Sequence, residues 1–110
     1  MTILNRVGAD EVPYVIWISN NEEFGSIKRD STTIFMLDTN RVDPYHYVVT
    51  KDNFAICKAV KHGNDWELLT MWGEVIQKLP DCEGSNQELI ISILLAAIQL
   101  VERWADYRKG

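Results

Sequence analysis

The segment that most constrains the fold of this chain is the apolar stretch close to its end. Ser85 and Glu88 have the S-x-x-E spacing of a capping box, which predicts a helix from Asn86 to about Tyr107. On a helix, the polar side chains of this segment fall in one narrow stripe: Glu88, Ser92, Gln99, Glu102, Arg103 and Asp106. The apolar remainder is far wider than the arc of about 100° that a surface helix needs. We therefore expect the helix to be enclosed on more than one side.

Enclosing this helix takes more apolar surface than one sheet and one neighbouring helix supply in a chain of 110 residues. Each large aliphatic side chain left in water forgoes about 1.5–3 kcal/mol of burial, and a residual apolar patch usually marks an association site. We expect a homodimer through the last helix, with Leu100, Trp104 and Tyr107 at the interface. The alternative is a monomer whose own chain wraps the helix.

The first half of the chain carries short runs rich in β-branched and aromatic residues, at 14–18, 32–37 and 45–50. Runs of this length bounded by turn formers predict three strands in an antiparallel meander. Trp17 and Phe35 fall in the middle of two of these strands, so we expect both in the core. The segment 21–30 fits either a long connection or a short helical turn.

The second half has a more helical pattern. The segment 54–60 fits a short helix stopped by Gly63, or a fourth strand that forms a hairpin with the third. Apolar residues between Leu68 and Leu79 have helical spacing, which predicts a helix that begins after Asp65 and ends at Pro80. The sequence thus predicts one α+β domain over residues 1–110, in which an N-terminal sheet of three or four antiparallel strands packs against two or three C-terminal helices.

Charge and cysteine content narrow the possible partners and the compartment. The chain has 11 Lys and Arg against 16 Asp and Glu, a net charge of −5, which disfavours binding to a phosphate backbone. The spacing of Cys57 and Cys82 matches no redox pair or zinc site, so we expect two free thiols, with Cys57 in the core. No secretory signal is recognisable, and the apolar segment 89–101 is shorter than the roughly 18 residues that a membrane span needs. These features predict a cytoplasmic protein that binds neither nucleic acid nor membrane.

Motifs for chemistry are weak throughout. No glycine-rich phosphate loop or nucleophile elbow occurs. Cys57 could act as a nucleophile only if His46 or His62 approached it. Asp38, Asp43 and His46 surround a turn, and their spacing favours a turn over a metal site. We expect no catalytic residue, cofactor or metal ligand.

The aromatic residues carry the functional prediction. Four Trp, four Tyr and three Phe exceed what a small core needs, and Trp and Tyr dominate binding hot spots. Tyr45, Tyr47 and Trp66 are the expected partner-binding residues. These observations predict a small acidic module of the inhibitor, immunity or adaptor type that binds another protein without catalysis. The alternative is a small enzyme or ligand-binding domain with a pocket between sheet and helices, where Tyr45 and Cys57 converge with Asp43 and His46.

Overall fold

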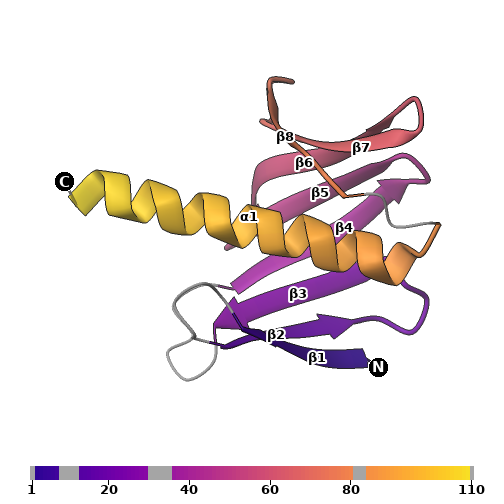
Figure 1. Ribbon diagram of the computed structural model, residues 1–110, viewed down its shortest axis with the longest axis horizontal. Coiled ribbons are helices and arrows are strands. Elements are labelled where there is room, and N and C mark those ends of the chain that lie inside the picture. Colours follow the sequence, from indigo (N-terminus) through magenta and orange to yellow (C-terminus); the bar gives the residue numbers. More distant parts are fainter. Residues whose placement is uncertain (1, 8–12, 30–35, 81–83, 110) are drawn as a thin grey trace.

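The computed structural model describes residues 2–7, 13–29, 36–80 and 84–109, with the side chains of 13–28, 37–80 and 84–102. Within these ranges the chain forms eight strands followed by one helix (Figure 1). The elements are β1 (Thr2–Val7), β2 (Pro13–Ile18), β3 (Phe24–Arg29), β4 (Met36–Asp43), β5 (His46–Lys51), β6 (Phe54–His62), β7 (Asp65–Leu69), β8 (Val75–Lys78) and α1 (Asn86–Lys109). Each strand pairs antiparallel with the next, so the sheet is an eight-stranded meander in sequence order.

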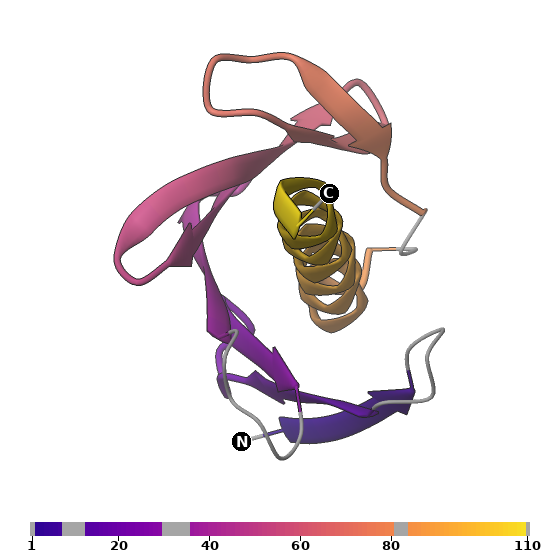
Figure 2. The same ribbon diagram turned by 90° about the vertical axis from the view of Figure 1, so that its left-hand side faces the viewer.

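The sheet curls around α1 and holds the helix on its concave face (Figure 2). Burial alternates along the strands, because successive side chains of a strand point to opposite faces. Two cross-strand rows on the concave face show the result. One runs through Ile16, Ile27 and Leu37, which are all buried. The next runs from Ile18 through Gly25, Thr39 and Val49 to Cys57.

The helix begins where the capping box predicts, since the Glu88 N–H donates to Ser85 Oγ at 3.3 Å. Its described part is buried around most of the circumference, and five side chains have no exposed surface at all: Ile90, Ile93, Leu94, Ala97 and Ile98. The more accessible positions follow one another at three- and four-residue intervals in a single stripe: Glu88, Ser92, Leu95, Gln99 and Glu102. The expectation of an enclosed helix is confirmed.

Gly25 sets how closely the helix approaches the sheet. A Cβ atom at this position of β3 would lie 2.5 Å from Ile90 Cγ2 and 3.3 Å from Leu94 Cδ1. Contacts of that length force a neighbour to move, so only glycine lets α1 settle against β3 as it does. A second tie comes from Tyr14, whose hydroxyl donates to Glu102 Oε2 at 3.1 Å. The helix is therefore held against β3 by packing and against β2 by a polar contact.

The α+β prediction is wrong, because the fold is predominantly β with one helix. The expected helix between Asp65 and Leu79 is instead the hairpin of β7 and β8. Its turn contains Gly73 at φ +99°, a backbone conformation that a helix does not contain. The second cover for α1 is thus the curled sheet itself, and no other helix is present in the described part of the chain.

Three further expectations are settled by the strands. The segment 54–60 belongs to β6, which confirms the hairpin alternative and rules out the short helix. Residues 24–29 form β3 where the sequence predicts a connection or helical turn. Trp17 is half-buried on the convex face, where its ring packs edge-on against Phe24 at 5.4 Å, so the expectation that it is a core residue is wrong. Phe35 and most of the expected strand 32–37 lie outside the described residues.

Candidate functional site

Tyr45, Tyr47 and Trp66 gather at the end of the sheet where α1 begins. Tyr45 lies in the turn between β4 and β5 and is 60% exposed, whereas Tyr47 is 1% exposed. The Tyr47 ring packs edge-on against Trp66 at 5.6 Å between ring centroids, and Trp66 is half-buried. Of the three expected partner-binding residues, Tyr45 is therefore exposed to solvent, whereas the buried Tyr47 packs against the half-buried Trp66.

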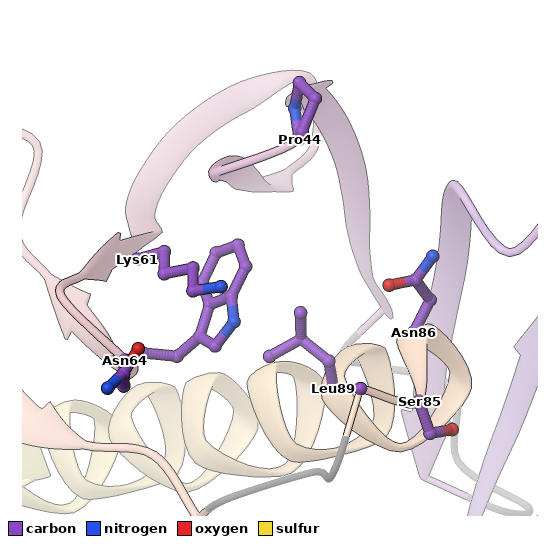
Figure 3. A pocket seen from close by; sticks show the side chains of 8 residues that line it. Pro44, Lys61, Asn64, Ser85, Asn86 and Leu89 are labelled. Carbon is purple, nitrogen blue, oxygen red and sulfur yellow. The ribbon is translucent and has the colours of Figure 1, made fainter.

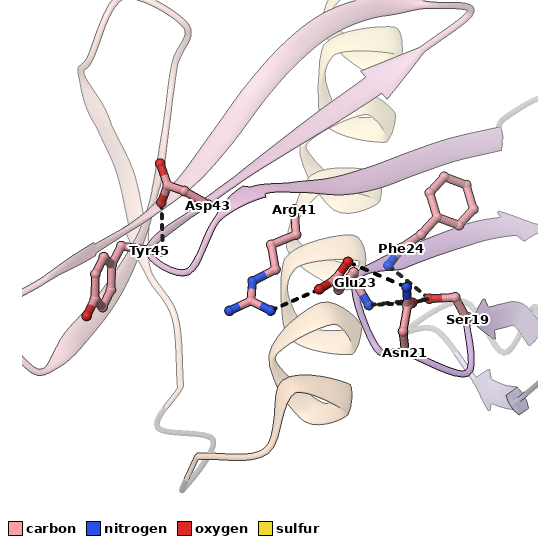
Figure 4. A network of polar contacts seen from close by, with 7 residues as sticks. All are labelled: Ser19, Asn21, Glu23, Phe24, Arg41, Asp43 and Tyr45. Atoms are coloured by element: carbon pink, nitrogen blue, oxygen red, sulfur yellow. Dashed lines mark hydrogen bonds and ion pairs between the residues drawn. The ribbon is translucent and has the colours of Figure 1, made fainter.

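The turns at this end of the sheet are fixed by short polar contacts (Figure 4). Asp43 Oδ1 accepts the Tyr45 N–H at 2.8 Å, and Ser19 Oγ accepts the Phe24 N–H at 3.1 Å. Arg41 pairs with Glu23 at 3.4 Å. Asp43 therefore acts as a turn former, which is the role that the sequence favours for it.

The pKa of the Tyr47 hydroxyl depends on its burial and on the charged side chains at this end of the sheet. Burial raises the pKa of the Tyr47 hydroxyl above its ordinary value, while the nearby Arg41 guanidinium opposes the shift and Glu23 adds to it.

Asp38 lies on the convex face of β4, opposite Thr50, and burial raises the pKa of its carboxyl. Asp38, Asp43 and His46 do not meet, and no group of three metal-ligating side chains is found among the described residues.

Cys57 and the two histidines do not form a nucleophile and base. His46 is paired with Val60 on the convex side of β5, whereas Cys57 is paired with Val49 on the concave face. His62 is at the exposed end of β6, with its Nδ1 atom 3.6 Å from Glu67 Oε1. Cys57 is a buried free thiol, as expected, and burial raises its pKa to about 12. The thiolate needed for attack is therefore not formed at neutral pH.

This burial predicts that Cys57 resists modification in the folded protein. Cys82 lies outside the described residues, so the experiment uses a Cys82→Ser variant with a single thiol. We expect Ellman's reagent at pH 8 to react at least 100-fold more slowly with the native protein than with the urea-unfolded protein. Because the pKa rises on folding, stability should hold below pH about 9 and fall as the pH rises toward 12. Equal rates in the native and unfolded proteins would contradict the burial.

A second group of aromatic and aliphatic side chains lies at the opposite end of the same strands. It occupies the β5–β6 and β7–β8 turns, and we call it the turn-end cluster. Its members and their exposed fractions are Phe54 (75%), Trp72 (77%), Val75 (57%) and Met71 (39%). Both turns lie at the end of the sheet opposite the β4–β5 turn, and Leu69, at the end of β7, is paired with Lys58, four residues along β6 from Phe54.

Both turns are tightly specified. Asp52 and Asn53 have φ values of 53° and 68°, the left-handed pair of a two-residue type I′ hairpin. In the β7–β8 turn, the Thr70 N–H donates to the Glu74 carbonyl at 2.8 Å, and Thr70 Oγ1 accepts the Glu74 N–H at 3.0 Å. Trp72 Nε1 donates to Glu74 Oε2 at 3.2 Å, which fixes the indole in its exposed position.

Sequence reasoning missed the turn-end cluster because helical spacing places Trp72 and Val75 on a buried helix face. Two signals could have revealed it. Asp52-Asn53 between two β-rich runs is a strong hairpin pattern, and Gly73 follows two large apolar residues where a turn needs a positive φ. Taken together, they place Phe54 and Trp72 beside turns.

The expected dimer residues lie on α1. Leu100 is half-buried, and Trp104 and Tyr107 belong to the helix, but their side chains lie outside the described set. The structure shows burial of most of the helix from Leu89 to Val101, and it describes no side chain beyond Glu102 on α1. Dimerisation through Leu100, Trp104 and Tyr107 therefore stays a prediction for sedimentation to test.

Comparison of the chain with models of protein families, with curated proteins and with solved structures finds no match. No helix in the described part of the chain combines the length and the apolar character required to cross a membrane. Function must accordingly be inferred from the surface chemistry of the molecule itself.

Proposed function

We propose that this chain is a small acidic protein-binding module, of the inhibitor, immunity or adaptor type, that acts through contacts with another protein and without catalysis. The observation that carries the proposal is the turn-end cluster. It exposes Phe54, Trp72 and Val75 by more than half of their surface while the core beneath the sheet is closely packed. Contiguous exposed apolar patches mark interaction sites in soluble proteins, and Met71, Trp72 and Val75 lie within five residues of one another in one turn.

The turn-end cluster has the properties of a binding hot spot. Trp is the residue type most enriched where truncation costs binding energy, and its contribution is largest when the side chain is already held in place. Trp72 is held in this way by its bond to Glu74, within a turn closed by backbone hydrogen bonds. Little conformational freedom is then lost when a partner covers it.

The charge of the chain indicates which kind of partner surface would bind the turn-end cluster. The net charge is −5, and the acidic Glu74 belongs to the same turn as Trp72, whereas Asp52 is paired with Lys51 at 3.1 Å. A partner that offers an apolar pocket with basic residues at its rim would match this surface and would be steered toward it at low ionic strength. We place this encounter in the cytoplasm, where a free buried thiol such as Cys57 is common.

The test is affinity purification from the source cell, followed by titration calorimetry with the purified captured protein. We expect Trp72→Ala to weaken binding by about 2 kcal/mol, which is roughly 30-fold. Tyr45→Ala is the matched control, because Tyr45 is also a largely exposed aromatic residue, 60% against 77% for Trp72, and lies at the other end of the sheet. Loss of binding in Tyr45→Ala alone would move the interface to that end, and binding unaffected by Trp72→Ala would refute the role of the turn-end cluster.

A further inference from the structure

A cavity of about 270 Å³ lies between the β4–β5 turn, the end of β6, the start of β7 and the start of α1 (Figure 3). It is lined by Pro44, Lys61, Asn64, Trp66, Gly84, Ser85, Asn86 and Leu89. The turn-end cluster lies elsewhere, because Phe54 begins β6 and Lys61 is close to its end. The cavity is thus a second site, independent of the proposed protein-binding surface.

The charge in the cavity is opposite to that of the whole chain. Among the described residues, its lining includes one cation, Lys61, and no carboxylate, whereas the chain carries a net charge of −5. The Lys61 side chain is directed toward the interior of the pocket (Figure 3). Its Nζ atom lies 5.7 Å from the centre of the Tyr45 ring, and no carboxylate of the described side chains is within ion-pairing distance of it. Lys61 is exposed to solvent, so an anionic group entering the cavity would pair with it without displacing a protein carboxylate.

The remaining lining divides into an apolar wall and neutral polar groups. Trp66 and the buried Leu89 form the apolar wall, and Tyr47 holds the Trp66 ring in place. Asn64 and Asn86 contribute side-chain amides, which can donate to an oxygen atom. The Ser85 hydroxyl already accepts the Glu88 N–H, so its own proton is available as a further donor.

We infer that this cavity binds a carboxylate carried on an apolar or aromatic group. Lys61 pairs with the carboxylate, and the apolar body lies against Trp66 and Leu89, with Asn64 and Asn86 on opposite sides of the pocket (Figure 3). The volume suits a single ring with a short acidic arm, since pockets for drug-sized ligands begin at roughly 300 Å³. The same chemistry is offered by a free organic acid and by the carboxy-terminal residue of a partner chain.

The inference is tested by titrating the ¹⁵N-labelled protein and following the Trp66 indole and Asn86 amide signals by NMR. The probes are phenylacetate and the peptide acetyl-Gly-Gly-Phe with a free carboxyl end. Phenylacetamide and the amidated peptide are their uncharged controls. We expect both acids to shift these signals saturably and to bind at least tenfold more tightly than the amides. Tighter binding of phenylacetate would assign the site to free acids, and tighter binding of the peptide acid would assign it to a chain end.

Substitution of the cation completes the test. Lys61→Met keeps the aliphatic stem and removes the charge, and it should weaken binding of the acids about tenfold. Lys58→Met is the matched control, because Lys58 lies on the same strand but is paired with Leu69 on the convex face, and it should leave affinity unchanged. Equal binding of acids and amides, or acid binding unaffected by Lys61→Met in a folded protein, would overturn the inference.

Discussion

Replacing Gly25 with alanine is expected to destabilise the protein by about 1–3 kcal/mol, although the side chain gains only one methyl group. The added carbon would lie 2.5 Å from Ile90 Cγ2 and 3.3 Å from the Trp17 carbonyl oxygen. The backbone of β2 cannot give way easily, so the helix or the Ile90 side chain must move. Urea unfolding followed by Trp fluorescence would measure the loss as a lower midpoint with an unchanged slope.

A double-mutant cycle separates this clash from a general intolerance of β3. Ile90→Ala removes the methyl group that alanine at position 25 would meet, at a cost of about 2–5 kcal/mol on its own. The two changes share one contact. The double variant Gly25→Ala/Ile90→Ala should therefore lose less free energy of unfolding than the sum of the two single losses, by at least about 1 kcal/mol. Ser26→Ala, whose side chain is on the convex face, is the control and should change stability by less than about 1 kcal/mol. Additive effects of Gly25→Ala and Ile90→Ala would show that the helix does not lie against Gly25.

The start of the helix and its enclosure on several sides could be predicted from the sequence, because the signals for both are local and strong. Ser85 and Glu88 mark the start of α1, and the narrow polar stripe requires cover on several sides. The sequence does not predict in the same way that a curled sheet covers the helix. The curl of a sheet arises from the accumulated twist of its strands and from bulges, such as those at Val49/Thr50 and Leu68/Leu69, and no local pattern encodes it.

The segment 64–80 was misassigned because apolar residues lie on both faces of its strands. Leu68 is fully buried on the concave face, Leu69 is half-buried on the convex face, and Trp66 and Ile76 also pack against the core. With apolar side chains on both faces, the alternation that identifies a strand is lost, and the spacing fits a helix equally well. Gly73 was the stronger signal, because a positive φ belongs in a turn.

The same difference between local signals and the arrangement of distant strands applies to the candidate sites. Tyr45 lies in the β4–β5 turn and Tyr47 on β5, and Trp66 is brought beside Tyr47 by the β6–β7 pairing, where it is opposite Lys61, so the sequence named these residues without showing how they meet. The cavity beside them and the turn-end cluster depend on which hairpins are neighbours. That information resides in the order of the strands around α1, which is fixed only when the meander is complete.

Placing a charge on the enclosed side of α1 should have the largest effect of any single substitution considered. Ile98 has no exposed surface, so Ile98→Asp would bury a carboxylate without a partner and should destabilise the protein by more than about 4 kcal/mol. Small domains have stabilities of about 5–15 kcal/mol, so this variant should be largely unfolded or strongly weakened. Circular dichroism and thermal unfolding would measure the loss.

Gln99 offers the matched control for Ile98→Asp, because it is the next residue of the same helix and lies on the accessible stripe. Gln99→Asp introduces the same side chain at the same depth along the helix, and we expect a change of less than about 1 kcal/mol. Ile98→Ala, which leaves a cavity instead of a charge, should fall between the two at about 2–5 kcal/mol. This order distinguishes a helix enclosed by its own sheet from one lying on the sheet surface, where the penalties at the two neighbouring positions would be similar. Equal stability of Ile98→Asp and Gln99→Asp would therefore contradict the enclosure on which the fold depends.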